Sequence, residues 1–270
     1  MIFSIVIYPM LYSIYMSFHK LKIVGTREIE FVGLSNFIDL LHDPAFTNAS
    51  LLAIRYVVVA ASVEIVLGLA MALLLNTKVK GTSVARVLIT IPIVLTPVIV
   101  GIFWKMILHS EVGYLNQVLS YFNLPVQNWI GNPETAIYAT AMVDIWEWTP
   151  FVALILLASM QAIPEETLEA AAVYGASGVQ TFRYVTLPLM TKGIFIAALL
   201  RVIDAARIFD QVYVLTRGGP ALSTDYVSIF IYRVGLEFFN VGYASAASWI
   251  YLIVISTVIT LFIKGARIKV

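Results

Sequence analysis

The sequence has no cysteine and little charge. Because none of its 270 residues is cysteine, a disulfide framework, a thiolate metal site and a cysteine nucleophile are all excluded. Charged residues make up 12% of the chain, against roughly 25% in an ordinary soluble domain. Hydrophobic residues make up 60%, and the mean hydropathy is +0.91. This composition excludes a soluble globular protein and predicts an integral membrane protein.

The chain also lacks an excess of one charge sign and a cluster of histidines. It carries 17 Lys and Arg against 16 Asp and Glu, a net charge of +1. There is therefore no basic field for nucleic acid, which is not an expected partner. His19, His42 and His109 do not have the spacing of metal ligands, and no Ser/His/Asp order is recognisable. No metal site and no catalytic residue are predicted.

Long hydrophobic runs dominate what is present. Apolar stretches of about 20 residues can cross a bilayer core about 30 Å thick as helices, whereas outer-membrane strands alternate in polarity over about ten residues. Six candidate spans cover residues 1–18, 50–75, 86–108, 135–160, 189–214 and 243–263. The predicted fold is an all-α polytopic membrane protein with about six transmembrane helices. Residues 1–270 are expected to form a single transmembrane domain with outer loops at about 19–49, 109–134 and 215–242.

Basic residues in the short loops indicate the orientation of the chain. If the first span begins inside, the inner segments carry Lys78, Lys80, Arg86, Arg183, Lys192, Lys264, Arg267 and Lys269. The outer loop at 109–134 contains no Lys or Arg, so the bias favours cytoplasmic location of both termini. The first span starts at Met1 without a basic flank. We expect that the natural chain begins earlier, with a cytoplasmic segment before Met1. A signal peptide is not expected, because a charged n-region and a small-residue cleavage site are both lacking.

Proline interrupts several of the spans. Pro92 and Pro97 lie at membrane depth in the third span. Such breaks are tolerated only where neighbouring helices or water satisfy the freed carbonyl groups. Ordinary kinked packing is one interpretation, and the other is a pair of kinks that lets helices rock, as a transporter requires.

A polar segment at 162–188 separates the fourth and fifth spans. Acidic residues from Glu165 onward place negative charge at the positive end of a helix, and Gly175 can take the left-handed conformation that ends one. Ser177 is positioned to cap a second short helix through about Tyr184, before Pro188 returns the chain to the membrane. The pattern predicts a helix-turn-helix elbow on the inner surface, shaped to fit a groove on a partner. A loop that merely joins two helices is the alternative.

Two spans carry ionisable residues, which are costly in a membrane and therefore expected to face a partner or a wet cavity. Arg201, Asp204, Ala205 and Ile208 share one helical face, and Asp144, Trp148 and Phe151 share another, with Glu147 beside them. Carboxylates bind hydroxyl groups and aromatic rings stack on sugars, so these sets suit a polyhydroxylated ligand. The alternative is that the charges pair, as Arg201 can with Asp204, to hold the bundle together. Glu64 and Arg55 are expected to make interhelical or subunit contacts.

The elbow also resembles the EAA loop of binding-protein-dependent ABC importer permeases. The resemblance rests on Glu169, Ala170, Ala171, then Gly175, Ala176, then Leu187, Pro188. Further family-like runs are Phe209, Asp210, Leu215 to Pro220 with Thr224, and Tyr232 with Gly242, Tyr243, Ala244 and Ala246. Together they resemble the maltose-permease-like subunit of the carbohydrate branch over nearly the whole chain. Tyr174 departs from the family pattern, which usually has Asp before the glycine.

The resemblance implies a function and a set of partners. It implies an importer subunit for a sugar, oligosaccharide or polyol that works by alternating access in the prokaryotic cytoplasmic (inner) membrane. Implied partners are a second homologous permease, an ABC ATPase dimer that binds ATP and Mg²⁺, an extracytoplasmic solute-binding protein and the lipid bilayer. No cofactor is expected in this chain, and a non-sugar solute such as glycerol phosphate, a passive channel and an intramembrane enzyme are the alternatives.

The resemblance also implies roles for particular residues. Those expected to couple to the ATPase are Glu165, Glu169, Ala170, Ala171, Tyr174, Gly175, Ala176, Phe182, Leu187 and Pro188. In the resembled family the two helices that flank the loop line the substrate cavity. The residues expected to line it here are Asp144, Trp148, Phe151, Arg201, Asp204, Ala205 and Ile208.

Overall fold

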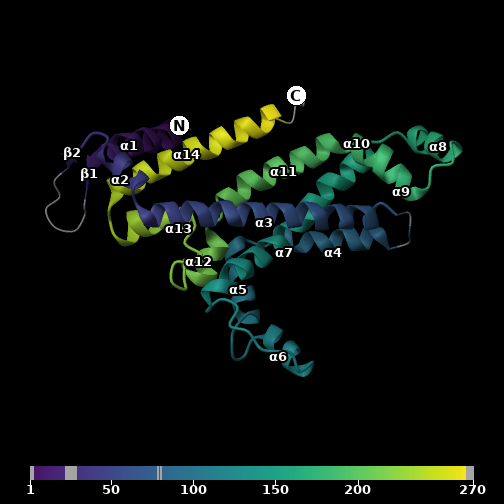
Figure 1. The fold of residues 1–270 in the computed structure, drawn as a ribbon, viewed down its shortest axis with the longest axis horizontal. Coiled ribbons are helices and arrows are strands. Elements are labelled where there is room, and N and C mark those ends of the chain that lie inside the picture. The colour runs from purple at the N-terminus through teal and green to yellow at the C-terminus, as the bar shows by residue number, and fades with distance from the viewer. Residues whose placement is uncertain (1–2, 22–28, 78, 80, 266–270) are drawn as a thin grey trace.

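A computed structural model of the chain describes residues 3–21, 29–77, 79 and 81–265. Met1 and the basic residues Lys78, Lys80, Arg267 and Lys269, which enter the orientation prediction, lie outside the described residues. The described part is almost wholly helical (Figure 1). The label η marks a short π-helix. The elements are η1 (Phe3–Ile7), α1 (Tyr8–Ser17), β1 (His19–Lys20), β2 (Glu30–Phe31), α2 (Ser35–Leu41), α3 (Pro44–Leu75), α4 (Thr82–Val94), α5 (Pro97–Ile107), α6 (Tyr114–Tyr121), α7 (Pro133–Gln161), α8 (Glu165–Val173), α9 (Gly178–Thr181), η2 (Phe182–Thr186), α10 (Leu187–Leu189), α11 (Thr191–Ala206), α12 (Asp210–Thr216), α13 (Val227–Tyr232), η3 (Arg233–Glu237) and α14 (Val241–Gly265).

The all-α fold is confirmed, but the spans are less regular than predicted. Within the described residues, α3, α7 and α14 are long and apolar enough to cross a membrane. Two bent pairs, α4 with α5 and the stretch 178–189 with α11, raise the number to five if each pair is one span. The first predicted span contains only a shorter apolar helix, Ile5–Ser17. The strands β1 and β2 form one antiparallel hairpin.

The predicted third span, 86–108, is not a continuous helix. It is broken between α4 and α5, whose axes differ by 96°. Leu95 and Thr96 are extended, with ψ angles of 145° and 141°. The ring of Pro97 disfavours helical geometry at the residue before it, which explains the break. The kink predicted at Pro97 is therefore confirmed, while α4 continues through Pro92.

The predicted fifth span, 189–214, is also wrong as a single helix. Helix α11 ends at Ala206, and α12 begins at Asp210 after a break at 207–209. Phe209 has φ −142° and ψ −64°, outside helical geometry. Asp210 then lies in the first turn of α12, where a carboxylate interacts favourably with the helix dipole. At the other end, residues 187–189 are helical, so Pro188 lies inside the helical stretch that the sequence analysis ended at about Tyr184.

The three predicted outer loops contain structure of their own. The first contains the β1–β2 hairpin, α2 and the beginning of α3, which starts at Pro44 rather than at 50. The second contains α6, and the third contains α13 and η3. In Figure 1 the hairpin, α2 and the beginning of α14 lie at one end of the molecule, and α8 and α9 lie at the other.

Packing of α3 along α7 forms the centre of the bundle. Tyr56 of α3, Ala141 of α7 and Phe230 of α13 belong to one buried apolar cluster, which also includes residues of α14. A second cluster joins Ala72 of α3 and Leu156 of α7 near the other end. Between them Gly68 allows a close approach, because a Cβ at this position would lie 2.6 Å from Cγ1 of Val152.

Gly68→Leu is expected to destabilise the α3–α7 contact by about 1–3 kcal/mol, because the added side chain overpacks a tight interface. Thermal unfolding of the detergent-solubilised protein measures the effect. Ala70→Leu is the matched control, since Ala70 lies two residues away on the exposed side of the same helix. Equal unfolding temperatures for the two variants would contradict the close packing at Gly68.

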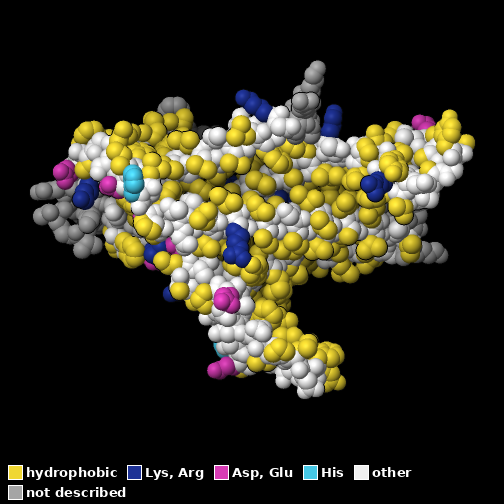
Figure 2. Space-filling model, in the orientation of Figure 1, with side chains coloured by type: hydrophobic (Ala, Val, Ile, Leu, Met, Phe, Trp, Pro, Cys, Tyr) yellow, Lys and Arg dark blue, Asp and Glu magenta, His cyan; other side chains and the backbone are white. Residues whose placement is uncertain are grey.

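Much of the apolar surface is not covered by the chain itself. In the most apolar window, only 28% of α3 and 11% of α14 is buried inside the structure. Figure 2 shows a surface that is mainly hydrophobic over the long helices, with most of the visible charges near its periphery. An apolar groove of about 650 Å³ lies between α3, α11 and α14. This surface suits a bilayer, in which apolar side chains remain exposed to lipid.

Candidate functional site

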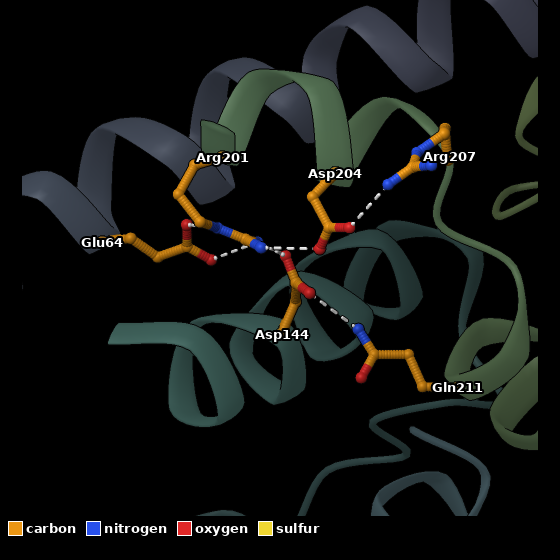
Figure 3. Close-up of polar contacts among 6 residues, drawn as sticks. All are labelled: Glu64, Asp144, Arg201, Asp204, Arg207 and Gln211. Atoms are coloured by element: carbon orange, nitrogen blue, oxygen red, sulfur yellow. Dashed lines mark hydrogen bonds and ion pairs between the residues drawn. The ribbon is translucent and has the colours of Figure 1, made fainter. Parts of the chain in front are cut away.

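A buried ionic cluster lies where α3, α7 and α11 meet. Arg201 of α11 donates from Nε and Nη2 to the two carboxylate oxygens of Glu64 on α3, at 2.5 and 2.9 Å. The same Nη2 donates to Oδ2 of Asp144 on α7 at 2.8 Å. The three side chains are at most 1% exposed. Figure 3 shows the guanidinium lying between the two carboxylates, which joins three helices through one cation.

The cluster extends toward the break that follows α11. Nη1 of Arg201 donates to Oδ2 of Asp204 at 2.9 Å, so the pair predicted from the i, i+3 spacing is confirmed. Asp204 is 39% exposed and also accepts from Arg207 at 3.2 Å. On the opposite side, Nε2 of Gln211 donates to Oδ1 of Asp144 at 2.9 Å. The cluster therefore runs from a buried centre to a partly exposed carboxylate (Figure 3).

Aromatic side chains cover one side of this cluster. The guanidinium carbon of Arg201 lies 5.0 Å from the ring centroid of Trp148, within range of a cation–π interaction. Phe151 packs edge-on against Trp148, with the ring centroids 5.8 Å apart. The sequence analysis predicted an aromatic pair on one span and charged residues on two spans. The structure brings these residues together in a single cluster.

Not every predicted cavity residue is in the cluster. Ala205 is 1% exposed and lies in the apolar core with Tyr56 and Tyr226, and Ile208 packs against the same core. Conversely, Gln211 belongs to the cluster although the sequence analysis did not select it. A buried amide two residues after a break could not be distinguished from a surface glutamine in the sequence.

Several buried polar atoms near the cluster have no hydrogen-bond partner. Both carboxylate oxygens of Glu147 are in this state, as is Oε1 of Gln211. Glu147 is 1% exposed and interacts electrostatically with Asp144, Arg201 and Asp204. Because almost all buried polar groups in proteins are paired, unpaired acceptors at one location suggest a site that receives donors from elsewhere.

Arg55 and Glu64 both make contacts between helices. Arg55 on α3 donates to the hydroxyl of Tyr138 on α7, and its guanidinium carbon lies 5.1 Å from that ring centroid. Glu64 reaches α11 through Arg201. The prediction of interhelical contacts is confirmed for both residues, and Glu64 is in addition a member of the cluster.

The polar segment forms the predicted elbow. Helix α8 ends at Val173, Tyr174 is its C-cap residue, and Gly175 has φ +80°. Oγ of Ser177 accepts from the backbone N–H of Gln180, and Oε1 of Gln180 accepts from the backbone N–H of Ser177 at 2.8 Å. This reciprocal capping box begins the second helical stretch. The helix-turn-helix prediction is therefore confirmed.

The elbow presents large apolar side chains to the outside. Tyr174 is 91% exposed, and Val173 and Val179 are nearly as exposed. Neither α8 nor α9 contains a buried residue. Of the predicted coupling residues, Glu165, Glu169, Ala170, Tyr174, Gly175 and Pro188 are exposed, and Ala171, Ala176, Phe182 and Leu187 are half-buried. An exposed apolar surface on a polar segment indicates a protein contact.

The loop after α12 is tightly folded. Oγ1 of Thr224 donates to the carbonyl oxygen of Gly219 at 2.8 Å, and Gly218 has φ +83°. Asp225 pairs with Arg233. Burial raises the pKa of Asp225, although the charge of Arg233 acts in the opposite direction. The family-like glycines therefore form part of an ordered loop.

Comparison with known proteins identifies the family. Residues 64–266 match the family of binding-protein-dependent transport system inner membrane components. The chain belongs to this family. The trehalose/maltose transport system permease protein MalF of Thermococcus litoralis is 33% identical over 98% of this chain and 89% of its own length. A probable ABC transporter permease, y4oQ of Sinorhizobium fredii, is 38% identical over 91% of this chain and 79% of its own length.

The solved structures support the same fold for this permease. A chain of a bacterial ABC transporter that imports the acidic polysaccharide alginate has a TM-score of 0.85 at 22% identity. The alignment covers 98% of this permease and 91% of that chain. The predicted type I importer permease fold is therefore confirmed, and the chain is a membrane transport subunit.

Proposed function

We propose that this permease carries a carbohydrate across the cytoplasmic membrane as one transmembrane subunit of an ATP-driven importer. The exposed elbow with its left-handed Gly175 is the observation that carries the proposal. A channel would not need a surface of this kind, whereas an importer needs a contact through which a separate ATPase moves the membrane helices. ATP and Mg²⁺ belong to that ATPase, and this chain contributes no catalytic residue.

A sugar, oligosaccharide or polyol is the proposed cargo. The printed name of the relative from Thermococcus litoralis includes trehalose and maltose, and the buried cluster supplies the groups that such a solute requires. Carboxylate and amide oxygens accept hydrogen bonds from hydroxyl groups, and the Trp148 ring offers a face for a sugar ring. A non-sugar solute such as glycerol phosphate is the second candidate.

The proposed assembly places this chain beside a second, homologous permease, two copies of the ATPase and an extracytoplasmic solute-binding protein. The small residues Ala53, Ala61 and Ala198 line the apolar groove and leave room for a closely packed helix of the partner permease. Both termini are proposed to lie on the cytoplasmic side together with the elbow, and the end of α3 and the beginning of α4, which join two spans on that side, lie at the same end of the molecule as the elbow (Figure 1).

Co-purification tests the assembly. The chain is tagged, the membranes are solubilised gently, and mass spectrometry identifies the proteins that are recovered with it. Recovery of a second permease and an ABC ATPase at stoichiometric levels is the expected result. Recovery of the chain alone from cells that contain a complete set of candidate subunits would contradict the proposal.

Asp204→Leu is expected to lower sugar uptake several-fold while the complex still assembles. Asp204 is the partly exposed acceptor of the cluster, so its loss removes a cargo contact, and the buried bonds of Arg201 to Glu64 and Asp144 remain. Uptake of labelled sugar and the recovery of partner subunits are measured together. Glu134→Leu, on the exposed first turn of α7, is the control. Loss of assembly would assign Asp204 a structural role instead.

A further inference from the structure

The buried cluster contains more carboxylates than cations. Glu64, Asp144 and Asp204 pair with Arg201, which is the one buried cation among the described residues of the cluster. Glu147 makes no hydrogen bond to Arg201 but interacts with it electrostatically. Arg207 also contacts Asp204, but it is 68% exposed and lies at the outer edge. A solute that enters this site therefore meets an excess of acidic groups.

The buried cation has little capacity left for an anion. Arginine has five N–H donors, and Arg201 already makes four hydrogen bonds with Glu64, Asp144 and Asp204. One face of its guanidinium is next to Trp148. A carboxylate or phosphate on the solute would have to displace one of these partners and leave it buried without a counter-charge, which is costly.

The vacant hydrogen-bonding capacity near the cluster includes three acceptor atoms, besides the hydroxyl groups of Tyr56 and Thr149, which can also donate. Both oxygens of Glu147 and Oε1 of Gln211 are buried without partners. A hydroxyl group can donate to such an acceptor without adding charge. A carboxylate or phosphate brings only acceptors and negative charge to the same location, and like charges in a poorly solvated site repel strongly.

We propose that this cluster selects uncharged polyhydroxylated solutes and rejects anionic sugars, with Glu147 as a specificity-determining residue. The inference rests on the proposed function and narrows its substrate class. It separates this permease from the structural neighbour whose cargo is an acidic polysaccharide, and it disfavours glycerol phosphate as cargo.

Matched pairs of neutral and anionic probes test the inference. Membrane vesicles that contain the complete importer and its own solute-binding protein are supplied with trehalose or trehalose 6-phosphate, and with maltose or maltobionate. We expect ATP-dependent uptake of the neutral member of a pair to exceed that of the anionic member at least about tenfold, a discrimination within the range of hydrogen-bonding sites. Binding of each probe to the isolated solute-binding protein is measured in parallel, so that selection by the membrane subunits is separated from capture.

The outcomes distinguish this inference from the proposed function. Equal or faster uptake of an anionic member would overturn the charge selection and leave the importer assignment intact. Absence of ATP-dependent uptake for every probe would count against the carbohydrate importer itself, and the inference would fall with it.

Glu147→Gln tests the assigned residue directly. This change keeps the shape of the side chain and replaces an ionisable carboxyl group with a neutral amide, so we expect the neutral-to-anionic uptake ratio to fall about threefold or more. Glu134→Gln makes the same replacement on the exposed part of the same helix and is expected to leave the ratio unchanged. A purely structural role of Glu147 would change the amount of assembled complex but not the ratio. An unchanged ratio in an assembled variant would overturn the assignment.

Discussion

Arg201→Ala is expected to destabilise the permease by about 3–5 kcal/mol, because it leaves buried carboxylates without their counter-charge. The change removes the cation that joins Glu64 of α3 and Asp144 of α7 to α11. Neither carboxylate can reach bulk water, since both side chains are at most 1% exposed. The amount of protein in the membrane and its unfolding temperature in detergent should both decrease.

Arg207→Ala is the matched control. Arg207 also contacts Asp204, but it is 68% exposed, and exposed ion pairs contribute about 0–1 kcal/mol. In the background of Arg201→Ala, replacing Glu64 and Asp144 with Gln and Asn should restore part of the lost stability, because the neutral side chains no longer require a counter-charge. An Arg201→Ala variant that accumulates and unfolds like the parent would show that the cluster does not hold the bundle together.

The elbow could be predicted from the sequence because helix ends and helix caps depend on residues close together in the chain. Gly175 and Ser177 act through the backbone within a few residues, and their consequences are a positive φ angle and a capping box. The pair of Arg201 and Asp204 was predictable for the same reason, because residues three apart on a helix are neighbours.

Hydropathy located the membrane segments but not their breaks. The stretches around Pro97 and Phe209 are apolar enough to pass as continuous helices, and composition carries no information on backbone geometry. At Pro97 the clash of the proline ring with the preceding residue decides the outcome. At Phe209 the backbone angles leave the helical region although no proline is present, so this break could not be predicted in the same way.

The composition of the cluster depended on contacts that sequence patterns do not contain. Glu64 and Arg201 are separated by 137 positions, and their pairing follows only from the packing of α3 against α11. Gln211 joins Asp144 because the break at 207–209 turns α12 back toward α7. Each ionisable residue was recognisable as costly in a membrane, but its partner was not.

Gly175→Pro is expected to abolish most sugar uptake, to below roughly a tenth of the parental rate, while ATP hydrolysis continues. Proline requires a φ angle near −65°, whereas Gly175 has φ +80°. Its backbone N–H, which proline lacks, donates to the carbonyl oxygen of Ala172 at 3.0 Å. A Cβ at this position would meet nothing within 4 Å, so the effect is one of backbone geometry rather than crowding. Uptake and ATPase activity are measured on the same reconstituted importer.

Gly178→Pro provides a control within the same elbow. Gly178 is the first residue of α9, a position where proline is well tolerated, and Ser177 before it is already extended with ψ 160°. This variant should therefore retain uptake close to the parental rate. If both variants transport normally, the bend between α8 and α9 is not required for coupling to the ATPase. If only Gly175→Pro loses uptake while the ATPase is still bound and active, the left-handed turn transmits the motion of the ATPase, because the two substitutions add the same residue three positions apart.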